Sequence, residues 1–264
     1  MTAPRYGDIS IAVNENDHVA FAEIHRPPHN FFDHQLIKDL SDAFEALDGD
    51  VRCRAIVLAA EGKSFCAGAD FSKRQAPAPA GAAPATENPL YSEAVRLFRC
   101  KKPVVAAIQG AAIGGGFGLA VAADFRVVTA DARFAANFVK LGFHPGFGLT
   151  FTLPRIIGEQ KACLMFYTGR RITGAEALAW GLADLLVAPE KLRETATSLA
   201  AEIAENAPLA VVSTRATMRA GLADAVKAQT DIEFREQSWL ARTEDHREGI
   251  KAVSERRPGR FQNK

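Results

Sequence analysis

The sequence predicts an α/β protein, because short apolar strands alternate along the chain with amphipathic or alanine-rich helices. Residues 19–24 alternate weakly between apolar and polar side chains and end at a proline pair, as a strand that enters a loop does. Residues 34–47 carry apolar side chains at three- and four-residue steps, which predicts a helix with one buried face. Residues 55–59 are continuously apolar and predict a buried strand. Strand and helix signals return between residues 103 and 128, so we expect repeated similar units.

The chain is expected to have two regions. Beyond residue 187 the pattern is helical, with stretches at 189–205 and 208–220 and a third that runs to residue 257. We therefore predict a core over residues 1–205 and a helical C-terminal region over residues 206–264. Apolar residues of the latter would contact the core or a neighbouring subunit, and the candidates are Phe234, Trp239 and Leu240.

Composition excludes several classes of protein. The chain has 32 basic and 31 acidic residues among 264, so it has no general attraction for nucleic acid or an anionic membrane. No apolar run approaches the roughly 20 residues that cross a bilayer. The first residues lack the apolar core of a signal peptide, so we expect a cytoplasmic protein. The four cysteines are scattered, which predicts reduced thiols and neither a zinc site nor a disulfide framework.

Residues 110–119 form a glycine-rich segment where a strand passes into a helix. Glycine lets the backbone approach a ligand closely, and the first turn of a helix leaves N–H groups unpaired at its positive end. Tight packing of the helix on a sheet would explain one or two of these glycines. The spacing fits neither a dinucleotide fingerprint, which needs a glycine at Leu119, nor a P-loop, which needs one at Val57.

Residues 64–71 form a second segment of small residues after a buried strand, with Asp70 as a candidate cap. One such loop is ambiguous. Two loops of this kind can each direct an N–H group at the same carbonyl oxygen, which is the geometry that stabilises an enolate. Residues 72–89, which are rich in alanine and proline, predict a surface loop that is either a lid or a plain linker.

These segments closely resemble the crotonase superfamily, also called the enoyl-CoA hydratase/isomerase family. The matching motifs span nearly the whole chain and lie at residues 26–30, 65–71, 102–110, 114–116, 153–158, 168–177 and 180–182. The resemblance implies a spiral of ββα turns and a C-terminal helical trimerisation region. It also implies a homotrimer or a hexamer made as a dimer of trimers, a coenzyme A thioester as substrate, and no separate cofactor or metal.

The resemblance assigns candidate residues to the site. The backbone N–H groups of Ala69 and Gly115 would form the oxyanion hole. Backbone around Pro28 and Ala67 would hold coenzyme A, and Arg256 matches a basic position that can meet its phosphates, although it equally suits a solvated charge run. Further candidate contacts to substrate or coenzyme A are His29, Asp70, Phe71 and Phe138.

The chain departs from the family pattern at both catalytic carboxylates. Gly118 stands at the first glutamate position and Phe138 at the second. Neither residue can transfer a proton, and each lost acid or base is worth roughly 10²–10⁴ in rate, so ordinary hydration is not expected to be efficient. His144 is the next candidate acid or base, because an imidazole titrates near physiological pH; it could instead be a packed loop residue or a substrate contact.

Three functions remain open on the sequence. The first is an acyl-CoA lyase or isomerase that uses the oxyanion hole in chemistry related to hydration, isomerisation, decarboxylation or C–C cleavage. The second is a non-catalytic acyl-CoA-binding homologue. The third is a C–C hydrolase of a β-dicarbonyl compound that is not bound to coenzyme A.

Overall fold

The computed structural model describes residues 5–70 and 87–264 and confirms the predicted α/β class. Its main sheet has seven strands in the order β1-β2-β3-β4-β5-β7-β10. Their bounds are Arg5–Tyr6, Ile9–Asn14, Val19–Ile24, Ala55–Ala60, Val104–Ile108, Phe125–Thr129 and Leu185–Val187. Neighbours from β3 to β10 are parallel, whereas β1, β2 and β3 pair antiparallel. The chain thus advances across the sheet one strand at a time.

A second sheet of three short strands lies beside the first and has the order β6-β8-β9, with bounds Ala111–Ile113, Arg133–Ala135 and Arg171–Thr173. β6 follows β5 after a two-residue turn and leads into helix α3, and β8 follows β7 and leads into the 3-10 helix η2. Two successive units therefore share the order strand, strand, helix, as the repeated strand and helix signals of the sequence predict.

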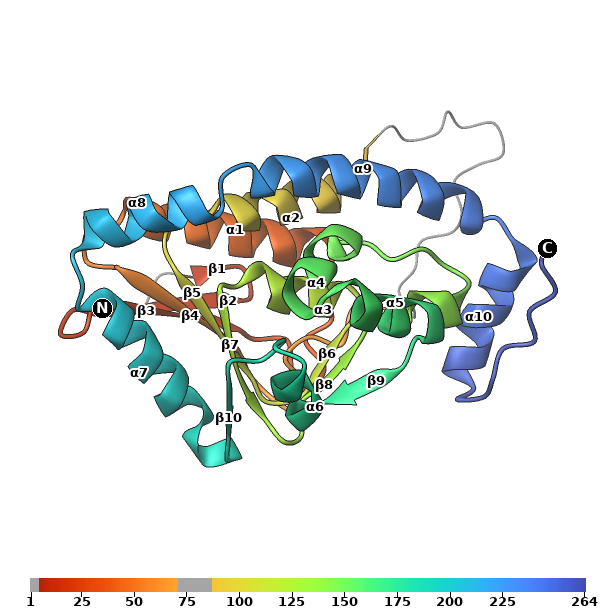
Figure 1. Cartoon of the computed structure of the whole chain (residues 1–264), viewed down its shortest axis with the longest axis horizontal. Helices are drawn as coiled ribbons and strands as arrows, with labels where there is room; N and C mark the ends of the chain where they lie inside the picture. The colour runs from red at the N-terminus through yellow and green to blue at the C-terminus, as the bar shows by residue number, and fades with distance from the viewer. Residues whose placement is uncertain (1–4, 71–86) are drawn as a thin grey trace.

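Helices cover both faces of the main sheet (Figure 1). The helices up to α6 are α1 His34–Gly49, α2 Pro89–Arg99, α3 Gly115–Ala122, η2 Asn137–Leu141, α4 Leu149–Ile157, α5 Glu159–Thr168 and α6 Gly174–Ala179. The later ones are η3 Pro189–Lys191, α7 Leu192–Ala204, α8 Pro208–Met218, α9 Leu222–Leu240 and α10 Glu244–Ser254. On one face of the main sheet, Leu192 and Ala200 of α7 pack against Val57 and Val105. On the other face, α1 to α4 contribute to the larger hydrophobic core. None of the described helices is long and apolar enough to cross a membrane.

The C-terminal region contains α8, α9 and α10. The third helical stretch of the prediction is interrupted at residues 241–243, where Thr243 caps α10 by accepting a bond from the N–H of His246. Helix α9 runs above α2 (Figure 1) and turns a largely polar face toward the core, formed by Val226, Thr230, Glu233 and Gln237. Trp239 does not supply a core contact, because this side chain is 54% exposed, and contact with a neighbouring subunit stays a prediction.

Candidate active site

The two glycine-containing segments lie side by side in the fold. The N–H of Cys66 donates to the carbonyl of Ala111 (2.9 Å), and the N–H of Ile113 donates to the carbonyl of Cys66 (3.0 Å). A Cβ on Gly116 would lie 2.1 Å from that Cys66 oxygen, so no larger residue fits there. Segments 50 residues apart in sequence are therefore joined edge to edge where α3 begins.

The candidate oxyanion residues lie at this junction, and Phe32 contacts both. Ala69 forms a parallel bridge with Phe32, whose ring Cζ lies 2.2 Å from the position of a Cβ on Gly115. Gly115 is the first residue of α3, so its N–H has no acceptor within the helix. Gly68, at φ +92°, precedes Ala69 and comes so near the Ile113 carbonyl that a Cβ would lie 2.9 Å from its oxygen. Ala69 and Gly115, the two predicted oxyanion residues, therefore both lie beside Phe32.

The predicted coenzyme A segments also adjoin this junction. The N–H of Ala67 donates to the His29 carbonyl (2.9 Å), and the N–H of Ser64 donates to the Pro28 carbonyl (3.3 Å). The buried amide of Asn30 donates to the Ser64 carbonyl at 2.7 Å and fixes the turn. Pro28 and His29 themselves are exposed. The segment of residues 28–30 is therefore hydrogen-bonded along the segment of residues 64–67.

Aromatic rings lie at both positions that the family resemblance assigns to glutamates. The Cζ atom of Phe138 lies 3.6 Å from the position of a Cβ on Gly114, which places the Phe138 ring at the glycine turn beside Gly115. A Cβ on Gly118 would lie 2.6 Å from Cβ and 2.7 Å from Cγ of Phe147. Phe147 is therefore packed where a side chain at position 118 would begin.

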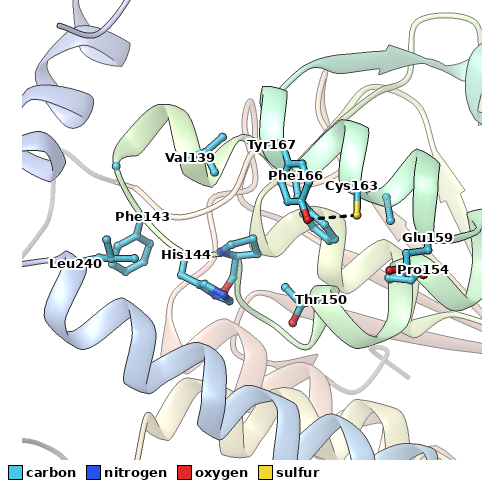
Figure 2. A pocket seen from close by; sticks show the side chains of 13 residues that line it. Val139, Phe143, His144, Thr150, Pro154, Glu159, Cys163, Phe166, Tyr167 and Leu240 are labelled. Atoms are coloured by element: carbon cyan, nitrogen blue, oxygen red, sulfur yellow. Dashed lines mark hydrogen bonds between the residues drawn. The ribbon is translucent and has the colours of Figure 1, made fainter. Parts of the chain in front are cut away.

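His144 lines a pocket beside η2. A pocket of about 510 Å³ opens between η2, α4, α5 and the end of α9 (Figure 2). Its lining residues are Val139, Gly142, Phe143, His144, Pro145, Thr150, Pro154, Glu159, Ala162, Cys163, Phe166, Tyr167 and Leu240. The Nδ1 atom of His144 is 2.8 Å from the Pro145 carbonyl oxygen. Among the described residues, Ala69 and Gly115 do not line this pocket, and the acid/base role of His144 stays a prediction.

Three further candidates stay predictions. Asp70 is half-buried at the end of the described N-terminal segment, and Phe71 lies outside the described residues, as does the predicted loop up to residue 86. Arg256 is exposed immediately after α10, a helix that packs on η2. Its neighbour Arg257 pairs with Glu248.

All four cysteines are free in the structure, and Cys66 is completely buried inside the glycine junction. Burial raises the pKa of its thiol to about 12, so this sulfur is protonated at neutral pH and is no nucleophile. Within the described part of the chain, no cluster of His, Cys, Asp or Glu side chains could hold a metal ion.

One functional candidate was missed by the sequence reasoning. Glu233 of α9 is buried, and its carboxylate accepts bonds from Gly148 N (2.7 Å), Thr150 N (3.0 Å) and Thr150 Oγ1 (2.6 Å). Burial raises the pKa of the carboxyl to about 7. The spacing of Gln229, Glu233 and Gln237 along one helical face was the available signal, because polar residues four apart share a face.

Comparison with known proteins decides the family. The family model described as enoyl-CoA hydratase/isomerase matches residues 14–264. The chain belongs to the enoyl-CoA hydratase/isomerase family. It is 34% identical over 255 residues to an (E)-benzylidenesuccinyl-CoA hydratase of Thauera aromatica, covering 95% of this chain and 98% of that relative. It is 30% identical over 239 residues to a 1,2-epoxyphenylacetyl-CoA isomerase of Escherichia coli, covering 89% and 91%.

The fold of an enoyl-CoA hydratase/isomerase is also recognisable in three dimensions. A crystal structure of an enoyl-CoA hydratase/isomerase from Pseudoalteromonas atlantica superposes with a TM-score of 0.83 at 25% identity, over 97% of this chain and 100% of that one. The predicted crotonase-like fold is thereby confirmed, and the protein is an enzyme of the hydratase/isomerase type.

Proposed function

We propose that this enoyl-CoA hydratase/isomerase family member binds an acyl-CoA so that its thioester oxygen accepts bonds from the N–H groups of Ala69 and Gly115. The observation that carries the proposal is the edge-to-edge pairing of the two glycine segments through Cys66 and Ala112. Backbone donors fixed in this way stabilise the negative oxygen of an enolate without reorganisation, and removal of one such donor typically costs about 10²–10³ in rate.

The reaction we propose is one that generates the enolate without a carboxylate base. In a thioester that carries a carboxylate on Cα, the C–C bond breaks and CO₂ leaves. The bonding electron pair becomes the enolate, whose charge rests on the thioester oxygen, and Cα then takes a proton from water. Phe138 and Phe147, which occupy the two glutamate sites, favour this path over hydration because hydration requires proton transfer to and from water.

A panel of three thioesters tests the proposal. Methylmalonyl-CoA should release CO₂, a saturated acyl-CoA should exchange its Cα hydrogens in D₂O slowly, and crotonyl-CoA should be hydrated at least 10² times more slowly than by an enzyme with both glutamates. Efficient crotonyl-CoA hydration would contradict the proposed chemistry. Tight binding of all three, without turnover of any, would instead favour the non-catalytic homologue, and absence of binding would favour a substrate without coenzyme A.

Ala69 offers a matched pair of variants for the oxyanion hole. Ala69→Pro removes the N–H group, whereas Ala69→Ser keeps it at the same exposed position. CO₂ release or Cα exchange should fall about 10²–10³-fold in the first variant and less than about threefold in the second. Equal losses in both variants would refute the role of this N–H group.

His144 is the alternative to water as the group that returns a proton to Cα, and this route requires the substrate to reach from the oxyanion hole into the separate pocket that His144 lines. His144→Asn should then slow Cα hydrogen exchange by about 10²–10⁴ while CO₂ release persists, because the C–C bond cleavage itself needs no acid. A loss below tenfold in exchange would assign the proton transfer to solvent.

We also propose that the C-terminal region joins copies of the chain into a trimer or a dimer of trimers. Large apolar side chains are exposed around the pocket and the chain end, namely Tyr167 at 77%, Trp239 at 54% and Phe261 at 45%. Size-exclusion chromatography with light scattering should give a mass three or six times that of the chain. Trp239→Lys should lower the measured mass. A natural protein that elutes as a monomer would contradict the proposal.

A further inference from the structure

Ser10, His25 and Glu61 come from neighbouring strands and meet on the face of the main sheet on which α7 packs. Ile9 and Ile11 flank Ser10 along β2, and both belong to the larger core on the opposite face. Successive side chains of a strand point to opposite faces, so Ser10 points away from that core.

His25 and Glu61 each follow the last residue of a strand. β3 ends at Ile24 and β4 at Ala60, and these two residues are register partners that both belong to the larger core. The pairing continues beyond them, because the N–H of Glu61 donates to the Ile24 carbonyl (2.9 Å). By the same alternation, His25 and Glu61 point to the face that carries Ser10.

The three side chains form a chain of hydrogen bonds. The Oγ atom of Ser10 lies 2.7 Å from Nε2 of His25, and Nδ1 of His25 lies 2.8 Å from Oε2 of Glu61. A carboxylate only accepts, so in the neutral imidazole Nδ1 carries the hydrogen and Nε2 accepts from the Ser10 hydroxyl. Nucleophile, base and orienting acid stand in this order in serine hydrolases, whose triad is recognised by geometry rather than by sequence position.

The loop that carries the acid is held by two buried or half-buried amides. Asn30 donates from Nδ2 to the Glu61 carbonyl (2.7 Å), and Gln109 donates from Nε2 to the Ala60 carbonyl (2.9 Å). The backbone on which the Glu61 side chain is mounted is therefore fixed relative to β3 and β5. A base whose orienting acid is fixed in this way is directed at its nucleophile before any substrate arrives.

Two further charges lie beside the triad. The Oε2 atom of Glu23 is 3.9 Å from Nε2 of His25, and Arg193 of α7 pairs with Glu23. The Glu23 carboxylate favours the imidazolium that forms when His25 takes a proton, and Arg193 brings a cation to the same face. Ser10 and His25 are half-buried rather than enclosed, so a small acyl compound can reach the hydroxyl from solvent.

We propose that Ser10, His25 and Glu61 are a nucleophilic triad that takes an acyl group from a thioester onto Ser10 Oγ and passes it to water. This activity goes beyond the proposed enolate chemistry. It uses neither the N–H group of Ala69 nor that of Gly115.

The reaction has two parts. As Oγ of Ser10 bonds to the carbonyl carbon, its proton passes to Nε2 of His25; the C–S bond then breaks, and the departing sulfur takes that proton and leaves as a free thiol. Water next attacks the acyl serine with His25 again as base, the C–O bond to Ser10 breaks, and Oγ recovers its proton. The products are a thiol and a carboxylic acid, and no oxidant or reductant is needed.

A fluorophosphonate tests the nucleophile, because it traps an activated serine irreversibly with loss of fluoride. Peptide mapping of the treated full-length protein should find the phosphonate on Ser10, and His25→Asn should slow this labelling by about 10² or more. His18→Asn is the matched control, since this exposed histidine contacts the Arg52 carbonyl and no serine is its printed partner, and it should leave the rate unchanged.

Glu61→Gln keeps the test decisive if His25→Asn does not fold, because Glu61 is exposed and its replacement leaves the core intact. It removes the charge that orients and stabilises the imidazolium and should slow labelling at least about tenfold. Absence of label on Ser10, or an unchanged labelling rate in both His25→Asn and Glu61→Gln, would overturn the triad.

Acetyl-CoA tests the acyl transfer itself. Release of free thiol should fall by about 10² or more in Ser10→Ala and persist in Ala69→Pro, which lacks the oxyanion N–H group. No thiol release from the natural protein, or equal release from Ser10→Ala, would overturn the acyl transfer. Because labelling of Ser10 does not involve Ala69, failure of the CO₂ and Cα exchange assays would refute the proposed function alone.

Discussion

Gly118→Ala tests whether the first glutamate position is closed by packing. The added methyl carbon would lie 2.6 Å from Cβ and Cδ1 of Phe147, about 1 Å nearer than the optimum of roughly 3.5–4.0 Å between carbon atoms. Phe147 is 1% exposed and sits at φ +64°, so its ring and backbone have little freedom to yield. Overpacking of this kind costs about 1–3 kcal/mol, and alanine recovers about 1 kcal/mol of helix propensity.

The net loss should be about 2 kcal/mol, which takes the upper end of the overpacking cost less the gain in propensity, because two of the close atoms are Cβ and Cγ, which are held near the main chain. For a chain of this size, that loss corresponds to a fall of roughly 4–8 °C in the melting midpoint. The assay is thermal unfolding followed by far-UV circular dichroism at one protein concentration, because association shifts the midpoint.

Gly49→Ala provides the control, since a Cβ at this exposed end of α1 meets nothing within 4 Å. It should leave the midpoint unchanged or raise it slightly. A Gly118→Ala midpoint equal to that of the natural protein would refute the reasoning. It would mean that Phe147 can move aside and that a glutamate could be placed at position 118 without other changes.

Three further predictions concern single residues. Phe138→Glu places a carboxylate beside the glycine turn and should speed Cα hydrogen exchange of an acyl-CoA by about 10²–10⁴, whereas Phe138→Gln should not. Burial raises the pKa of Glu233 to about 7 in the folded protein, so its contribution to the free energy of unfolding should fall by about 3 kcal/mol between pH 4.5 and 7. In urea unfolding at a series of pH values, Glu233→Gln should lack this fall in the free energy of unfolding. Cys66 should resist iodoacetamide in the folded state, since burial raises its thiol pKa to about 12, and rapid labelling would contradict its placement.

The candidate site was predictable where its signal is local. The two glycine segments can be recognised in the sequence by their residue types, and in the structure they are joined through Cys66 and Ala112. The absence of carboxylates at Gly118 and Phe138 was equally visible. The contact of Phe147 with Gly118 was not predictable, because it spans 29 positions and depends on where the loop before α4 is placed.

The sequence by itself determined the fold class and the family, because periodicity and motif spacing are properties of neighbouring residues. Only the tertiary structure decided that His144 lines a pocket apart from the glycine segments and that α9 turns Glu233 rather than Trp239 inward. The physical reason is that burial is set by contacts between distant segments. A glutamate on an amphipathic helix is ordinarily solvated, and it becomes a buried acceptor only when the N–H groups of Gly148 and Thr150 are brought against it.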